Sequence, residues 1–383
     1  MNRRLATTAT LLLALALPLP LAATASAAAA PSATSTKPSR TQLELPRPTG
    51  PLGVGREVLH LVDRSRVDQW AKSGPRELMV TMYYPARHGT GRPAPYMQVE
   101  EARRLLGARE LQDTVDPAVV AATRTAARTD ARPLGGTYPL VVLSPGFGVH
   151  RATLSSLAED LTSRGYLVAL VDHAYESVGT AFPGGRLPEC LACDQAETVG
   201  YDKVTEGRAK DVSFLLDRLT GRHPAWRHAG MIDRRRIAMA GHSIGGASAA
   251  SAMAADPRIR AGVDMDGSLF TPAATDDRPF LLLGAAETTP GHEPSWDRDW
   301  SRLGGWKRWI TFTGSGHFTF TDYPALGDQL GLPDPDFPLS GARSVELTRR
   351  YVGAFLDLHL KGRPQPLLDG PRPDAPEVLF HTP

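Results

Sequence analysis

One short segment of the sequence carries the parts needed for nucleophilic catalysis. Residues 241–245 are Gly-His-Ser-Ile-Gly, and Gly246 extends the run. The pattern G-x-S-x-G places a serine on a sharp turn between a strand and a helix, where small neighbours let the two elements approach. The apolar run 237–240 precedes the motif and a helical stretch, 247–254, follows it. We therefore predict that Ser243 is a nucleophile; the alternative is an ordinary glycine-rich turn.

A serine hydroxyl needs a neighbouring base, and in chains with this motif the acid and the histidine follow the serine. His317 lies in the small-residue segment 314–318, directly after the apolar run 306–312, which predicts a strand. The other histidines after Ser243 lie before that strand, inside the final helix or near the C-terminus. His317 is therefore the predicted base.

Two positions compete for the acid that orients the imidazole. Asp264 and Asp266 end the predicted strand 259–265, and the alternation of side chains along a strand points both the same way. Asp266 lies closer to the carboxyl edge of the sheet, where such sites form. Glu287 follows the next predicted strand, 280–283. Position alone leaves Asp266 and Glu287 as equal candidates.

The oxyanion of an acyl-transfer reaction needs two backbone N–H donors. Ile244, which follows the nucleophile, would supply one. The segment 143–148, Leu-Ser-Pro-Gly-Phe-Gly, leaves an early predicted strand, and its glycines free the backbone to turn an amide inward. Phe147 is the predicted second donor; the alternative is a simple glycine-rich strand exit.

Short apolar segments that alternate with amphipathic ones must position these residues. The patterns predict strands at 78–84, 140–143, 166–171, 236–240, 259–265, 280–283 and 306–312, and helices at 99–111, 117–128, 154–163, 203–219, 245–254 and 345–360. This alternation is typical of an α/β protein with a mostly parallel sheet covered by helices on both faces.

The N-terminus predicts export. Arg3 and Arg4 precede the apolar run 11–21, and an alanine-rich segment with A-x-A sites follows. This is the layout of a secretory signal peptide over residues 1–30, cleaved near residues 27–30, and it predicts a secreted, extracellular protein. After it, we expect a Pro/Ser/Thr-rich linker over 31–53, one catalytic domain over 54–370 and a Pro-rich tail over 371–383.

Charge and cysteine content exclude several classes of protein. The chain has 43 Lys+Arg against 41 Asp+Glu, and the excess lies in the first 30 residues, so nucleic acid is not an expected partner. Cys190 and Cys193 are the two cysteines. They lack further ligands at zinc spacing, and the sequence around them predicts no strand-to-helix redox unit. We predict that they form a short-loop disulfide and that the protein has no metal site.

The sequence resembles the plasma-type platelet-activating factor acetylhydrolases and their bacterial relatives in the α/β-hydrolase superfamily, from about residue 78 to residue 355. The resemblance is carried by the segments 142–148, 164–173, 241–246, 262–267 and 316–322. It implies the α/β-hydrolase fold and a catalytic triad of Ser243, Asp266 and His317, because the family's acid follows the strand after the nucleophile helix. The donors of the oxyanion hole would be Phe147 and Ile244.

The sequence departs from the family in three places. Pro145 stands where the family often has histidine, and the segments 88–135 and 180–202 match no family pattern. We expect these two segments to shape the acyl pocket. Glu287 stays the alternative acid, because related polyester hydrolases and lipases usually keep the acid there.

Together these features predict a secreted serine ester hydrolase that works through an acyl-enzyme, without a metal or an organic cofactor. Its partner would be a small-molecule or lipid ester, either a short-chain acyl ester or the sn-2 acyl group of a phospholipid, with transient contact to a lipid surface. The sequence does not specify the oligomeric state. A cutinase-like polyester hydrolase or a triacylglycerol lipase is the alternative within the class. A non-catalytic binding protein of the same fold is the alternative outside it.

Overall fold

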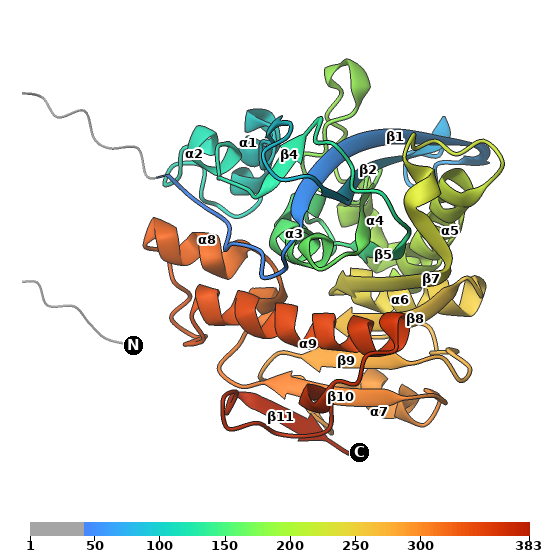
Figure 1. The fold of residues 1–383 in the computed structure, drawn as a ribbon, viewed down its shortest axis with the longest axis vertical. Helices are drawn as coiled ribbons and strands as arrows, with labels where there is room; N and C mark the ends of the chain where they lie inside the picture. The colour runs from blue at the N-terminus through green and yellow to red at the C-terminus, as the bar shows by residue number, and fades with distance from the viewer. Residues whose placement is uncertain (1–41) are drawn as a thin grey trace, which may run out of the picture. The chain divides into compact units, whose positions relative to one another are not determined.

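Within residues 42–383, the apolar segments pair into a single sheet of eleven strands. The computed structural model describes residues 42–383, so the predicted signal peptide and most of the predicted linker lie outside the described residues. The strand order is β11-β10-β9-β8-β7-β5-β6-β2-β1-β4-β3 (Figure 1). The strands are β1 (Gly53–Val67), β2 (Pro75–Ala86), β3 (Arg92–Pro93), β4 (Ala127–Thr129), β5 (Tyr138–Ser144), β6 (Leu167–His173), β7 (Ile232–His242), β8 (Ile259–Met265), β9 (Phe280–Gly284), β10 (Lys307–Phe312) and β11 (Val378–His381).

The central strands confirm the predicted parallel sheet. Strands β6, β5, β7, β8, β9 and β10 pair in parallel. Strand β2 pairs antiparallel with β6 and β1, β1 pairs in parallel with β4, and β11 pairs antiparallel with β10 at the other edge. The described helices are α1 (Val99–Gly107), α2 (Pro117–Ala121), α3 (Ser155–Ser163), α4 (Leu191–Val199), α5 (Tyr201–Thr220), α6 (Ile244–Ala255), α7 (Pro294–Trp300), α8 (Tyr323–Leu330) and α9 (Gly341–Lys361). A short 3₁₀ helix, η4, spans His317–Phe320.

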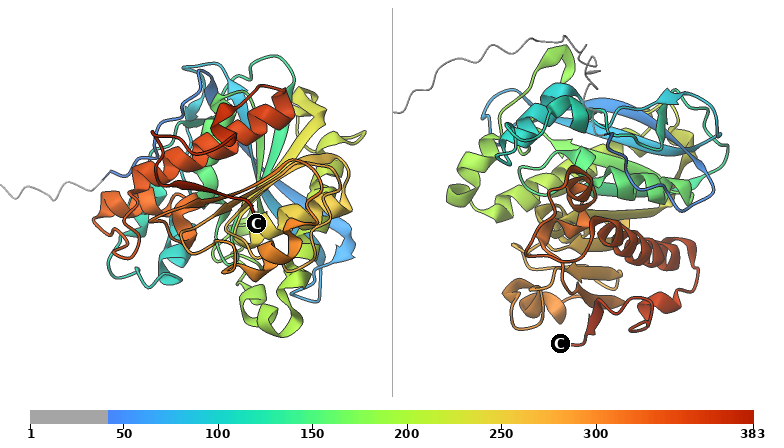
Figure 2. Two further views of the ribbon diagram at one scale, coloured as in Figure 1. Left: turned by 90° about the horizontal axis from the view of Figure 1, so that it is seen from below. Right: turned by 90° about the vertical axis from the view of Figure 1, so that its left-hand side faces the viewer.

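Alternate residues of the central strands face two separate hydrophobic cores. On β5, Leu140 and Val142 pack in the core that α5, α6 and α7 cover, whereas Val141 and Leu143 pack in the core beneath α3 and α9. Figure 2 shows α9 along one face of the sheet. Because both faces are buried, the strands are apolar throughout, which is the pattern that made them visible in the sequence.

The predicted helix 117–128 is wrong over its second half. Helix α2 ends at Ala121, and Ala127–Thr129 forms β4, which pairs with β1. The carboxylate of Glu159, buried on α3, accepts hydrogen bonds from the N–H groups of Ala126 (3.0 Å) and Ala127 (3.0 Å). A charge-assisted hydrogen bond from a distant part of the chain thus outweighs the local helix propensity of the alanines.

The predicted catalytic domain, residues 54–370, is too short at both ends. Within the predicted linker, Leu43 and Leu45 are buried in a small core together with α1 and α2. Within the predicted tail, Val378–His381 forms β11 along the edge of β10, and Val378 is buried. Proline-rich composition concealed both segments, although single apolar residues within them pack against the domain.

The structure contains the predicted disulfide between Cys190 and Cys193. The pair opens α4, with Cys190 at the N-cap, a helix that the sequence did not predict. The segment before it is a loop rather than a strand, so the thioredoxin-like arrangement is absent here. Of the helices between residues 42 and 383, none is both long enough and apolar enough to cross a bilayer.

Removal of residues 371–383 should destabilise the domain, because it strips β11 from the edge of β10 and exposes the surface that Val378 covers. We expect a loss of about 2 kcal/mol or more in the free energy of unfolding, measured by urea denaturation. Removal of only Thr382 and Pro383, both exposed, is the matched control. Equal midpoints for the two truncated proteins would show that the segment is a dispensable tail.

Candidate active site

The backbone of Ser243 has an unusual conformation at the junction of β7 and α6. Its φ is 56° and its ψ is −130°, a region that residues with a side chain seldom occupy. The Ser243 N–H donates to the carbonyl of Met265 at 2.7 Å. A Cβ atom on Gly245 would lie 2.1 Å from the carbonyl oxygen of Ser144, and one on Gly246 would lie 1.9 Å from Asp264 Oδ1. The glycines of the motif are therefore required by close approach of neighbouring groups.

Asp266 and His317 form a hydrogen-bonded pair. His317 Nδ1 donates to Asp266 Oδ2 at 2.6 Å, and Asp266 Oδ1 accepts from the Ala285 N–H (2.7 Å) and from Thr288 Oγ1 (2.6 Å). Burial raises the pKa of the Asp266 carboxyl, but these three hydrogen bonds outweigh burial and leave the pKa below its usual value. Asp266 is therefore ionised at neutral pH and holds the imidazole by its Nδ1 side.

His242 holds the other side of the His317 segment. Its Nε2 donates to the carbonyl oxygen of His317 at 2.7 Å, and the two imidazole centroids are 4.7 Å apart. Burial, followed by the charge of His317, lowers the pKa of His242 to about 3, so this imidazole stays neutral. Since His242 immediately precedes Ser243, the contact brings the loop of His317 to the elbow. The Ser243 hydroxyl and His317 share no hydrogen bond within residues 42–383, as is common before substrate binds.

The two other acids considered from the sequence lie elsewhere. Glu287 is exposed, and its carboxylate makes no hydrogen bond to His317. Asp264 is buried beneath the elbow, where its Oδ1 accepts from the Gly267 N–H at 2.9 Å. The expectation that Asp264 and Asp266 point the same way is wrong, because a φ of 62° at Asp266 breaks the strand alternation. Burial, then the nearby charge of Asp266, raises the pKa of Asp264 well above its usual value.

The two predicted oxyanion donors lie on either side of the elbow. Ile244 begins α6, and Phe147 lies in the loop after β5. Within the described part of the chain, neither backbone N–H donates to a protein acceptor. Gly146 lies against the elbow, since a Cβ built on it would be 2.9 Å from His242 Nδ1 and 3.4 Å from Ser243 Cβ. Two N–H groups beside the serine are therefore available to a ligand oxygen.

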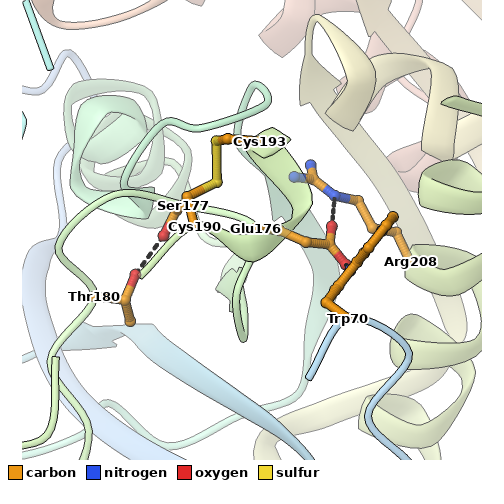
Figure 3. Close-up of a disulfide and its surroundings, with 7 residues drawn as sticks. All are labelled: Trp70, Glu176, Ser177, Thr180, Cys190, Cys193 and Arg208. Atoms are coloured by element: carbon orange, nitrogen blue, oxygen red, sulfur yellow. Dashed lines mark hydrogen bonds and ion pairs between the residues drawn. A yellow bond between two sulfur atoms is a disulfide. The ribbon is translucent and has the colours of Figure 1, made fainter. Parts of the chain in front are cut away.

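Sequence reasoning missed a buried ion network that holds the loop after β5, which carries Phe147. Arg208 of α5 donates through Nη1 to the carbonyl oxygen of Pro145 (2.6 Å) and through Nε to Glu176 (2.8 Å). Glu176 also accepts from Trp70 Nε1 (2.8 Å) and from Arg76 (2.7 Å), and Figure 3 shows it between Trp70 and Arg208, near the disulfide. The available signal was the pair of charged residues, Arg208 and Asp211, at buried positions of α5 among apolar ones.

An apolar cavity of about 720 Å³ borders His317. Its walls come from α1, α2, η4, α8 and the loop before α9, and include Leu106, Val120, Phe318, Leu326 and Phe337. The segment 88–135 therefore contributes to the lining of this cavity. Tyr201 lies within the segment 180–202. Its ring contacts that of Phe147 edge to face, with 5.6 Å between the ring centroids.

The sheet order, the strained serine after β7 and the Asp–His pair define a carboxylic ester hydrolase of the α/β-hydrolase fold. A family model described as platelet-activating factor acetylhydrolase, isoform II, matches residues 38–184 and 225–332. The chain belongs to this family, and the family predicted from its motifs is confirmed.

Several similar proteins are esterases. The chain is 29% identical over 377 residues to a probable 1-alkyl-2-acetylglycerophosphocholine esterase of Arthroderma benhamiae, covering 88% of this chain and 93% of that protein. It is 22% identical to a platelet-activating factor acetylhydrolase of Cavia porcellus, over 82% and 78% of the two chains. The solved structure of a ferulic acid esterase from Streptomyces cinnamoneus superposes with a TM-score of 0.81 at 44% identity, covering 89% of this chain and 99% of that one.

Substitution of Asp266 should cripple ester hydrolysis, whereas substitution of Glu287 should not. Asp266→Asn keeps the shape of the side chain but removes the charge that orients and stabilises the histidine, so we expect kcat to fall about 10³-fold or more. Glu287→Gln is the control and should change kcat by less than about twofold, given its exposure. Steady-state hydrolysis of 4-nitrophenyl acetate measures both. A large loss confined to Glu287→Gln would overturn the assignment of the acid.

Proposed function

We propose that the chain is an exported serine esterase in which Ser243, His317 and Asp266 act as nucleophile, base and acid. The observation that supports this most directly is the 2.6 Å hydrogen bond between Asp266 and His317 beside the strained serine. Ser243 adopts a costly backbone conformation and lies next to an oriented imidazole and two unused N–H donors. This arrangement fits an activated nucleophile better than a structural turn.

The proposed reaction has two halves. His317 takes the proton of the Ser243 hydroxyl as its oxygen attacks the ester carbonyl, and the N–H groups of Phe147 and Ile244 stabilise the resulting oxyanion. Collapse of this intermediate breaks the bond to the alcohol, which leaves with the proton from His317. Water, deprotonated by the same histidine, then attacks the acyl-enzyme and releases the acid and free Ser243. The ionised Asp266 stabilises the imidazolium in both halves.

The substrates proposed first are short-chain acyl esters, including an sn-2 acetyl group of a phospholipid. The apolar cavity next to His317 supports an ester with one large apolar arm, and transient contact with a lipid surface would deliver such a molecule. Export is proposed from the layout of residues 1–30, and N-terminal sequencing of protein recovered from the medium checks cleavage near residues 27–30.

Ser243→Ala should abolish hydrolysis of 4-nitrophenyl acetate, lowering kcat about 10⁵-fold or more, because the nucleophile itself is removed. A fluorophosphonate probe should label the wild-type protein at Ser243, as located by peptide mass spectrometry. Ser251→Ala, on the same helix but behind the elbow, is the matched control and should keep both activity and labelling. Equal rates for Ser243→Ala and wild type would leave only a non-catalytic role for the fold.

A second candidate substrate is a hydroxycinnamate ester, favoured by the 44% identity to the ferulic acid esterase over nearly its whole length. The aromatic rings of Phe147, Tyr201 and Phe270, which contact one another beside the elbow, would stack on an aryl acyl group. We expect kcat/KM for an sn-2 acetyl phospholipid to exceed that for methyl ferulate. A higher value for methyl ferulate would reverse the order of the two candidates.

A further inference from the structure

The cavity beside His317 contains a cation that no carboxylate neutralises. Arg109 follows α1 and lines this cavity. Its guanidinium carbon lies 4.0 Å from the ring centroid of Phe318 and 4.8 Å from that of Tyr323. Over the described residues, Arg109 forms no ion pair with an aspartate or a glutamate. Stacking on the two rings orients the plane of the guanidinium, and within the described residues no carboxylate occupies its donors.

The two carboxylates that border the same cavity accept hydrogen bonds from backbone N–H groups and form no ion pair with Arg109. Asp328 and Asp334 border the same cavity, but Asp328 accepts from the Gly341 N–H at 2.7 Å and Asp334 accepts from the Asp336 N–H at 3.1 Å. On α1, by contrast, Arg103 pairs with Glu100 at 2.9 Å. The charge of Arg109 reaches the active site, since it contributes, after burial and the charge of His317, to the lowered pKa of His242. Arg109 is thus a cation without a carboxylate ion-pair partner among the described residues, in the wall of the cavity that borders His317.

The chemistry of the site decides which arm of an ester this cavity holds. The leaving oxygen must lie close to His317, which protonates it, whereas the carbonyl oxygen must face Phe147 and Ile244. The cavity borders Gly316, His317 and Phe318, and its lining includes neither oxyanion donor. The alcohol arm therefore enters the cavity, and the acyl arm lies on the side of Phe147 and Tyr201. This assignment differs from the acyl pocket expected from the sequence.

We propose that Arg109 binds an oxyanion, a carboxylate or a phosphate, on the alcohol arm of the ester. The planar guanidinium presents paired donors to such a group, and the apolar walls supplied by Leu105, Leu106 and Val120 strengthen the attraction by excluding water. The inference rests on the proposed function, because it uses His317 as the group that protonates the leaving alcohol.

The test compares aryl acetates that share the acetyl group and differ in the substituent on the alcohol arm. 4-Acetoxybenzoate carries a carboxylate on the alcohol arm, 4-acetoxyphenyl phosphate carries a phosphate, and methyl 4-acetoxybenzoate is the neutral reference. The measured quantity is the ratio of kcat/KM for each anionic ester to that for the neutral ester, in wild type and in variants, so that differences in intrinsic reactivity cancel. Arg109→Leu should lower this ratio about tenfold or more. Arg109→Lys keeps the charge but lacks the paired donors of the planar guanidinium, and it should lower the ratio less.

Controls separate this inference from the proposed function. Arg103→Leu, exposed on α1 and outside the cavity, should leave the ratio unchanged. Ser243→Ala should remove turnover of all three esters; if it does not, the proposed function fails. If Ser243→Ala is inactive but Arg109→Leu and Arg109→Lys keep the wild-type ratio, the inference about Arg109 alone is overturned. An Arg109→Leu effect confined to monomethyl terephthalate against dimethyl terephthalate, which place the charge on the acyl arm, would also overturn it. The larger loss among the two anionic acetates identifies the oxyanion.

Discussion

The parallel hydrogen-bond ladder continues past the ends of the strands, and this continuation sets the whole site. The Ser243 N–H donates to Met265 at 2.7 Å, the Asp266 N–H donates to Leu283 at 2.8 Å, and the Ala286 N–H donates to Ser315 at 3.2 Å. The first two bonds link the residue directly after β7 and the residue directly after β8 to the neighbouring strand, and the third links the loop after β9 to the loop after β10. The backbone around Ser243, Asp266 and His317 is therefore positioned by one continuous series of hydrogen bonds. The positive φ of Ser243 costs about 1–3 kcal/mol. It persists because these backbone hydrogen bonds and the close packing at Gly245 stabilise this conformation.

The loop after β5, which carries Phe147, is held by a second set of contacts. These contacts are buried ion pairs and hydrogen bonds to charged groups rather than backbone pairing. Arg208 is almost fully buried and would be costly to desolvate alone, but Glu176 and the Pro145 carbonyl satisfy its donors. Arg76 extends the network to Asp68 and Asp211, joining β2 to α5. Removal of one partner from such a network typically costs about 3–5 kcal/mol, because a buried charge loses its counter-ion. The loop that carries Phe147 is thus tied to α5 by a buried charged group without being part of the sheet.

The parts of the site that could be predicted from the sequence are those fixed by local pattern. The glycines around Ser243 and the small residues before His317 report backbone constraints within a few residues, so the motif identifies both positions. The choice between Asp266 and Glu287 was open from position alone, because it depends on the positive φ at Asp266, a feature without a composition signal. The resemblance to the family favoured Asp266, and the hydrogen bond to His317 agrees with it.

Long-range contacts explain what the sequence did not predict. Residues 126–127 leave the helical pattern because Glu159 accepts from their N–H groups, and residues 378–381 form a strand because β10 has a free edge. Arg208 was invisible as a site residue because its partners, Glu176 and Pro145, lie more than 30 residues away in the chain. The ester hydrolase class and the central sheet follow from periodicity and motif; the boundaries and the supporting polar groups follow from tertiary partners.

Helix α1, which lines the cavity, is anchored to the core by buried polar contacts. Glu101 of α1 is buried and accepts from His150 Nε2 at 3.2 Å and from the Ala181 N–H at 3.0 Å. Burial raises the pKa of Glu101, but the neighbouring His150 and Arg151 lower it to about 2, so the carboxylate stays ionised throughout the range in which the protein would work. Tyr96, just before the helix, donates to the buried Asp322 at 3.1 Å and ties the same segment to η4 and α8. Because the helix is ordered on folding, Arg109 is held over Phe318 before any ligand arrives, and binding need not supply the free energy of ordering it.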